Sequence, residues 1–186
     1  MTRLPVHGRY ERILVPTDFS SDSLVAARVA AAFQGEAQLE FIHAISTRDE
    51  AKLRSAEASE QVVLAYRKRC LEYAQERMLE FTRTLAMHDN PKIITKLSRG
   101  DRGLQTAKHQ ERSGADLVVV GTKRRSAWRD VLLGSTAHRI LRWASSDVLL
   151  VPGPAAGDPQ MSSHRSWAVE AGPSVLDLRS AERRAS

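Results

Sequence analysis

Residues 117–152 constrain the fold of this chain more than any other stretch, because they hold two apolar runs joined by a connection that carries glycines. The first run, residues 117–120, ends at Gly121, and the second covers residues 148–151. Between them lie a basic loop and a segment with a helical pattern that begins at Gly134. This order predicts a strand, a loop, a helix and a second strand, as in a parallel sheet.

The same connection has the chemistry of an anion site. A glycine at the end of a parallel strand lets the backbone approach a ligand closely. A helix that opens with Gly134 and Ser135 offers unpaired backbone N–H groups and the positive end of its dipole. The loop before it adds cationic side chains, namely Lys123, Arg124, Arg125 and Arg129. The stretch therefore predicts a site that attracts an anion.

Further strand and helix patterns alternate before this stretch. Short apolar runs predict strands at residues 12–16 and 38–44, and a partly polar run at 93–97 predicts an edge strand. Helices are expected where apolar spacing of 3.6 residues follows a capping residue. The first expected helix is capped by Ser20 or Ser21 and stops at Gly35, and the second covers residues 58–85. The third covers residues 102–112, between Asp101 and Gly114, and the fourth covers residues 134–144.

The second of these helices follows a charged stretch, residues 47–60, that we interpret as a loop with a little helix. Extending the helix back to residue 49 would make it about 60 Å long, too long for this domain. Cys70 is expected to be a small buried side chain. The apolar stripe that should face the core consists of Val63, Leu71, Ala74, Met78, Phe81 and Leu85.

The alternation predicts an α/β fold: one doubly wound, five-stranded parallel sheet with helices on both faces. Ligands of such sheets bind at the carboxyl ends of the strands, where the strand order reverses. We expect residues 1–11 to be a flexible leader, residues 12–152 to form the α/β domain, and residues 153–186 to be a mostly disordered tail, because glycine, proline and serine recur there.

Composition excludes several classes of protein. No stretch approaches the ~20 apolar residues of a membrane span, and the first ten residues lack the apolar region of a signal peptide, so we expect a cytoplasmic protein. A single cysteine, Cys70, allows neither an intrachain disulfide nor a thiolate metal cluster. The net charge of +6 is interpreted as a solvated basic surface. Nucleic acid is not expected as the main ligand, because Trp128 is the one aromatic residue within the basic loop.

Three motifs in order resemble those of the universal stress protein family. They are VPTDFS at residues 15–20, IHA at residues 42–44, and ADLVVVGT at residues 115–122 followed by GSTA at 134–137. The resemblance covers residues 12–152 and implies the strand order 3-2-1-4-5. It also implies a homodimer in which the last strand of each subunit joins the other, here through Val148, Leu149, Leu150 and Val151.

The resemblance further implies an adenine nucleotide, such as ATP, in the cleft above the first and fourth strands. Asp18 matches the acidic residue that lies against the nucleotide, although a turn residue that bonds nearby backbone N–H groups is an alternative reading. Ser135 matches a position that lines the nucleotide site, and it can serve as an N-cap at the same time. The complete set of matching positions is Pro16, Thr17, Asp18, Ala44, Val120, Gly121, Thr122, Lys123, Arg124, Gly134, Ser135, Thr136 and Ala137.

Two of these positions depart from the family pattern. Nucleotide-binding members have Gly, two residues, Gly, nine residues, Gly and Ser or Thr, and Arg124 stands at the second glycine. An arginine is disfavoured if the loop needs a positive φ there, and its side chain fills space that glycine would leave to the phosphates. However, a guanidinium can itself bind phosphate. Ala44 replaces a larger aliphatic residue, which would loosen the grip on a base.

Two functions remain open. The first is a dimeric stress-response regulator that binds ATP or a related nucleotide, with Mg²⁺ bridging phosphates to Asp18 if nucleotide binds. The second is an interaction module in which Arg124 occupies the phosphate site. An enzyme is the less favoured class, because the chain has no Walker A loop, no GxSxG elbow and no HExxH motif. We assign no catalytic residue and no metal ligand, and we interpret His43 as a structural hydrogen-bonding group.

Overall fold

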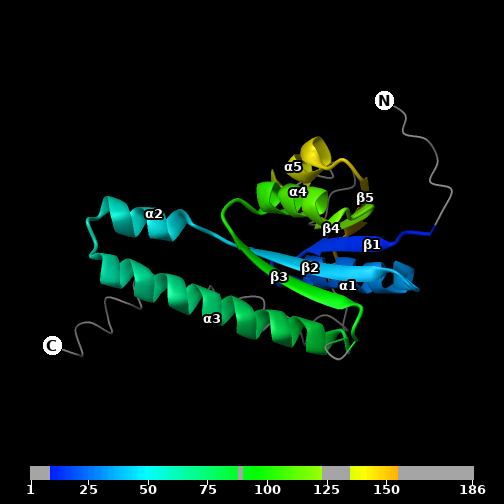
Figure 1. The fold of residues 1–186 in the computed structure, drawn as a ribbon, viewed down its shortest axis with the longest axis horizontal. Helices are drawn as coiled ribbons and strands as arrows, with labels where there is room; N and C mark the ends of the chain where they lie inside the picture. Colours follow the sequence, from blue (N-terminus) through cyan, green and yellow to red (C-terminus); the bar gives the residue numbers. More distant parts are fainter. Residues whose placement is uncertain (1–8, 88–89, 123–134, 155–186) are drawn as a thin grey trace.

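The computed structural model describes residues 9–87, 90–122 and 135–154, which form an α/β domain (Figure 1). Strands and helices alternate along the chain, except that two helices follow the second strand. The elements are β1 (Arg12–Pro16), α1 (Ser21–Gln34), β2 (Gln38–Ile45), α2 (Arg48–Ser55), α3 (Glu60–Thr84), β3 (Ile93–Arg99), α4 (Arg102–Ser113), β4 (Leu117–Thr122), α5 (Ser135–Trp143) and β5 (Asp147–Pro152).

The five strands form one parallel sheet with the order β3-β2-β1-β4-β5. This arrangement confirms the predicted fold class and strand order. The order reverses between β1 and β4, where Leu14 lies beside Val118. The carboxyl ends of these two strands therefore border the position at which doubly wound sheets bind their ligands.

Alternating side chains of the strands pack against helices on opposite faces of the sheet. Ile13 and Val15 of β1 face a cluster that includes Phe81 of α3, whereas Leu14 faces Ile140 of α5. Figure 1 shows α1 and α3 on one side of the strands, and α4 and α5 on the other. Both faces of β1 are thus covered, which explains its uninterrupted run of apolar residues.

The capping residues predicted for two helices lie at the observed helix ends. The Ser20 hydroxyl accepts a hydrogen bond from the N–H of Ser23 at 3.4 Å, and the Asp101 carboxylate accepts one from Leu104 at 3.0 Å. Gly114 ends α4 with a φ of 67°, in the left-handed conformation that favours glycine. These local signals fix where α1 and α4 begin, and both helices begin at the carboxyl edge of the sheet.

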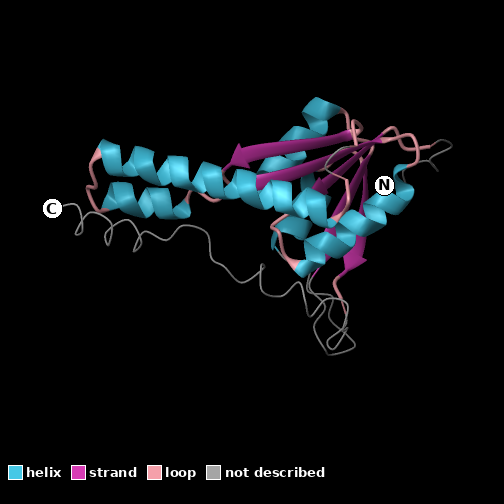
Figure 2. Cartoon of the chain, turned by 90° about the horizontal axis from the view of Figure 1, so that it is seen from below, coloured by secondary structure: helices cyan, strands magenta, loops and turns pink. Residues whose placement is uncertain are grey.

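The little helix expected within residues 47–60 is α2, and α2 and α3 form a hairpin that extends beyond the sheet (Figures 1 and 2). Cys70 is buried with Leu53 of α2, as predicted for Cys70. The predicted stripe on α3 is wrong at Leu71, whose exposed fraction is 43%, while Tyr66 is buried. The reason is that the first half of α3 packs against α2, whereas the second half packs against the sheet.

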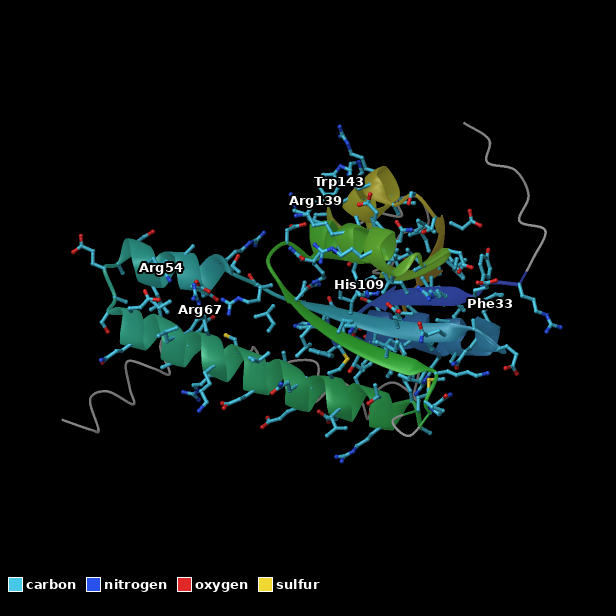
Figure 3. The ribbon with its side chains drawn as sticks, in the orientation of Figure 1. Phe33, Arg54, Arg67, His109, Arg139 and Trp143 are labelled. Carbon is cyan, nitrogen blue, oxygen red and sulfur yellow. The ribbon has the colours of Figure 1, made fainter. Side chains whose placement is uncertain are left out.

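A carboxylate inside the hairpin anchors it to the sheet. Glu50 of α2 is buried and forms ion pairs with Arg54, Arg67 of α3 and Arg99 at the end of β3. Figure 3 shows Arg54 and Arg67 in the space between the two helices. The three cations hold the pKa of Glu50 below its usual range, chiefly through the hydrogen bond from Arg67 and against the effect of burial. The hairpin is therefore fixed by charge as well as by apolar contacts.

A second buried carboxylate lies between the sheet and α4. Glu40 of β2 accepts a hydrogen bond from Nε2 of His109 at 2.7 Å, and both side chains are largely shielded from solvent. Figure 3 places His109 between α4 and the strands. The hydrogen bond from His109 gives the buried carboxylate of Glu40 the polar partner that it needs in the sheet interior.

Two general findings apply to residues 9–87, 90–122 and 135–154. No helix among them is long and apolar enough to cross a membrane. They also contain no group of three or more His, Cys, Asp or Glu side chains placed to hold a metal ion. The expected tail lies outside the described residues apart from Gly153 and Pro154, and so does the expected leader apart from residues 9–11.

Candidate ligand site at the carboxyl edge of the sheet

The turn after β1 is held by a set of internal hydrogen bonds. The Thr17 N–H donates to the carbonyl of Ile42 at 2.9 Å, and its hydroxyl accepts from the N–H of Phe19 at 3.0 Å. Its own carbonyl lies 2.9 Å from Nδ1 of His43. Thr17 is fully buried, so its polar groups serve the turn, and the turn fixes the position of the next residue, Asp18.

Asp18 presents its carboxylate at the carboxyl edge of the sheet, with 31% of the side chain exposed. Its Oδ1 accepts hydrogen bonds from the N–H and the hydroxyl of Ser20, the N–H at 3.1 Å. Its Oδ2 lies 2.7 Å from Nη1 of Arg102. Burial raises the pKa of Asp18, but the hydrogen bonds from Ser20 and the charge of Arg102 outweigh it and hold the pKa below its usual range. Asp18 is therefore ionised at neutral pH.

Phe19 anchors this turn in an uncommon backbone conformation. Its φ is 62°, in the left-handed region that a bulky residue seldom adopts. The ring stacks on the imidazole of His43 with centroids 4.3 Å apart and meets Phe81 edge-on at 6.0 Å. The buried ring, packed on His43 and Phe81, holds the Phe19 backbone in this strained conformation.

His43 has the structural role expected from its position at the end of β2. Its ring is hydrogen-bonded to the Thr17 carbonyl and stacked on Phe19. Burial lowers the pKa of His43, and the hydrogen bond to Thr17 offsets this only in part. The ring is therefore neutral at neutral pH, with Nδ1 as the donor, because a carbonyl oxygen can only accept.

Gly121, at the end of β4, is required by packing. A Cβ at this position would overlap the carbonyl of Asp22, in the first turn of α1. Gly153, just after β5, approaches the side chain of Asp22 in the same way, and its N–H donates to the Thr122 carbonyl at 2.8 Å. The start of α1 thus lies directly against the ends of β4 and β5. We predicted Gly121 from its motif as a point of ligand approach, and the helix contact is a separate reason for glycine.

The first turns of α4 and α5 are also in close contact. A Cβ on Gly103 would stand 2.7 Å from Cβ of Arg139 and 3.3 Å from the Thr136 carbonyl. The carboxylate of Asp101, which caps α4, forms an ion pair with Arg139 at 2.5 Å. Figure 3 shows Arg139 beside Trp143, with the guanidinium 5.9 Å from a ring centroid. Two helix N-termini therefore lie side by side at this edge of the sheet.

The turn between β3 and α4 contributes residues that our sequence analysis did not assign to the site. Arg99 reaches Glu50 of the hairpin, Asp101 reaches Arg139 of α5, and Arg102 reaches Asp18. A signal for them exists, because Gly100 and the capping Asp101 follow the third predicted strand after two intervening residues. The carboxyl ends of parallel strands share one edge, so a charged residue at this place belongs near the site.

The structure brings most of the predicted site residues to this edge. Pro16, Thr17 and Asp18 end β1 or follow it, and Ala44 lies near the end of β2. Thr17 and Ala44 are buried, so their accessible surface is small. Val120, Gly121 and Thr122 end β4, while Ser135, Thr136 and Ala137 begin α5. Lys123, Arg124 and Gly134 lie outside the described residues.

Comparison with known proteins gives consistent results. Residues 9–152 match the model of the universal stress protein family. Universal stress protein MJ0531 of Methanocaldococcus jannaschii is 32% identical over 147 residues, which cover 78% of this chain and 84% of that protein. Among solved structures, hypothetical protein MJ0577 has a TM-score of 0.63 at 21% identity, over 80% of this chain and 100% of its own. A universal stress protein family protein from Arabidopsis thaliana with AMP bound has a TM-score of 0.51 at 14% identity, over 81% and 98%.

Proposed function

The chain belongs to the universal stress protein family, as its motifs predicted, and on that basis we propose that it is a stress-response regulator that binds an adenine nucleotide at the carboxyl edge of its sheet. The observation that carries the proposal is the position of Asp18, an ionised and partly exposed carboxylate directly after β1, the strand at which the sheet order reverses. The Arabidopsis protein of similar fold, which has AMP bound, supports this choice of ligand.

The residues at this edge suit the two halves of a nucleotide. Asp18 can accept hydrogen bonds from the base or the ribose, because a carboxylate offers about four acceptor positions. The N-terminal turn of α5, with the exposed Ser135 and the half-buried Thr136, can donate backbone and hydroxyl hydrogens to phosphate oxygens. Mg²⁺, if it binds together with the nucleotide, would neutralise part of the negative charge of the phosphates. ATP is the nucleotide that we propose first.

Isothermal titration calorimetry with ATP and AMP, each with and without Mg²⁺, tests this function. We expect saturable binding to the full chain and a loss of at least about tenfold in affinity for Asp18→Asn, which retains the shape of the side chain. Asp49→Asn removes the same charge from the exposed surface of α2 and should bind as the unmodified chain does. No binding at millimolar nucleotide would reject the proposal.

The replacement of a motif glycine by Arg124 favours a second candidate function. In it the guanidinium occupies the phosphate site, and the protein acts as an interaction module of the same fold. Arg124→Gly distinguishes the two candidates, because the variant should gain nucleotide binding, or bind it much more tightly, only if Arg124 blocks the site. An affinity that is unchanged in this variant argues against the interaction module.

We also propose that the protein is a homodimer that pairs along β5. This strand is at the end of the sheet order, and Val148, Leu149 and Leu150 are only partly buried there. Leu141 and Trp143 of α5 add exposed apolar surface, each 45% exposed. Light scattering after size exclusion should give a dimer mass, and Leu150→Lys should give a monomer. Leu79→Lys changes an exposed leucine of α3 and should remain dimeric.

A further inference from the structure

We propose that Arg102 determines which ligands the site accepts: it occupies Asp18 in the free protein and transfers to an anionic group of the ligand when one binds. The site would then favour nucleotides over nucleosides. This inference rests on the proposed function, because it concerns the ligand class of the same site. It assigns a role to a residue that lies outside the sequence motifs of the site.

The position of Arg102 follows from the sheet order. The residue begins α4, directly after the turn that ends β3, and β2 separates β3 from β1. Its guanidinium nevertheless reaches the turn after β1, where Nη1 lies 2.7 Å from Oδ2 of Asp18. The start of α4 therefore lies close enough to the turn after β1 for the Arg102 side chain to bridge the two. The Arg102 side chain is 39% exposed, so solvent and ligands can reach it.

The contact limits the acceptor capacity of Asp18. Ser20 already uses Oδ1 with two hydrogen bonds, and Arg102 uses Oδ2. A base or ribose that donates to Asp18 must therefore displace Arg102 or share Oδ2 with it. The bonds from Ser20 belong to the turn itself, whereas Arg102 comes from another element with a flexible side chain. Arg102 is thus the partner that a ligand can replace.

A second place for the guanidinium lies close by. Gly103, the next residue, is packed against the first turn of α5, where its Cβ would stand 3.3 Å from the Thr136 carbonyl. The backbone of Arg102 therefore lies next to the helix end that is proposed to receive the phosphates. Arg139 of α5, another cation close to Gly103, already pairs with Asp101. Arg102 can exchange a carboxylate for a phosphate, two anions that a guanidinium fork binds in the same geometry.

This exchange has opposite consequences for two classes of ligand. A neutral nucleoside removes Arg102 from Asp18 and offers the guanidinium no anion in return, so binding carries an uncompensated loss. A nucleotide replaces the lost ion pair by a new one with its phosphate. Arg102 would therefore weaken the binding of adenosine and strengthen the binding of ATP.

The test compares adenosine, ATP and inorganic tripolyphosphate on the full chain and on Arg102→Gln, by calorimetry without divalent cations. In the variant we expect roughly threefold tighter adenosine and roughly fivefold weaker ATP and tripolyphosphate, magnitudes typical of a partly exposed ion pair. Arg112→Gln removes the same charge from the exposed last turn of α4 and should leave all three affinities unchanged. Circular dichroism melting of each variant confirms that it folds.

Each other result has a definite meaning. If adenosine and ATP change by the same factor in Arg102→Gln, or neither changes, Arg102 does not select ligands and the inference is wrong. If both bind more tightly, Arg102 is only a competitor for Asp18, which also overturns it. If ATP binds the unmodified chain no better than tripolyphosphate, the adenine site fails, whereas Arg102-dependent tripolyphosphate binding would still support the role of Arg102 toward anions.

Discussion

The backbone carbonyl oxygen of Asp22 lies 2.4 Å from where a Cβ on Gly121 would stand, so the first turn of α1 and the end of β4 touch without an intervening side chain. This contact connects α1, the helix after β1, to β4, the neighbour of β1 at the reversal of the sheet order. The glycine is thus needed for folding, whatever the site binds. Glycine at this position can therefore be explained by the packing of α1, whereas the motif alone suggested the approach of a ligand.

Gly121→Ala should lower the free energy of unfolding by about 1–3 kcal/mol, because the new methyl group forces α1 away from β4. Urea unfolding followed by circular dichroism measures the change. Gly114→Asn is the matched control: this glycine has a φ of 67° with open space around it, and asparagine tolerates that conformation. A variant at Gly121 as stable as the control would show that α1 can move at little cost.

Glu50→Gln should destabilise the hairpin by about 1–2 kcal/mol, because three arginines lose the charge that they surround. The loss is smaller than for a fully buried pair, since the arginines are 35% to 47% exposed. Hydrogen exchange of α2 and α3 amides should accelerate more than exchange in the sheet. Glu72→Gln, on an exposed pair with Lys68 at 3.8 Å, should change neither measurement.

His43→Asn should reduce the dependence of stability on pH between about 7.5 and 5.5. Since burial lowers the pKa of His43 in the folded chain, the unfolded chain binds the proton first as the pH falls. The wild-type free energy of unfolding therefore decreases below the usual histidine pKa of 6.5. Asparagine keeps a donor to the Thr17 carbonyl but does not titrate. Equal pH slopes for the two proteins, from urea midpoints, would contradict the assigned protonation.

Asp18→Asn should lower stability by about 1–2 kcal/mol at neutral pH, because the amide cannot replace a carboxylate between Ser20 and Arg102. The folded pKa of Asp18 lies below its unfolded value of 3.8, so its contribution is complete above that value and is lost as the pH falls through the folded pKa. The difference between the two proteins should then disappear in acid. A difference that persists at low pH would mean that shape, and not charge, is responsible.

The sequence predicted the strands, the caps and the carboxyl edge because these depend on local patterns. Asp101 and Gly114 mark the ends of α4 by their own chemistry, which needs no tertiary information. The ion pair of Asp18 with Arg102 joins residues 84 positions apart. Finding it requires knowing that the start of α4 and the turn after β1 meet at one edge of the sheet.

The assignment of Leu71 to the core failed for a different reason. Helical periodicity assumes one partner along the whole helix, but α3 packs first against α2 and then against the sheet. The half that contacts α2 therefore buries Tyr66 and Cys70 beside Val63, and Leu71 faces solvent. Val63, Ala74, Met78 and Phe81 are buried as predicted, and Leu71 is the position at which the stripe was wrong.

The contacts made by the turn between β3 and α4 depend on its length. Within residues 99–102, Arg99, Asp101 and Arg102 point to three different elements: the hairpin, α5 and the turn after β1. Inserting or deleting one residue there would rotate each later side chain away from its partner, so all the contacts after the change would be lost together. Substitutions in this turn can be compensated one at a time, whereas changes in its length cannot.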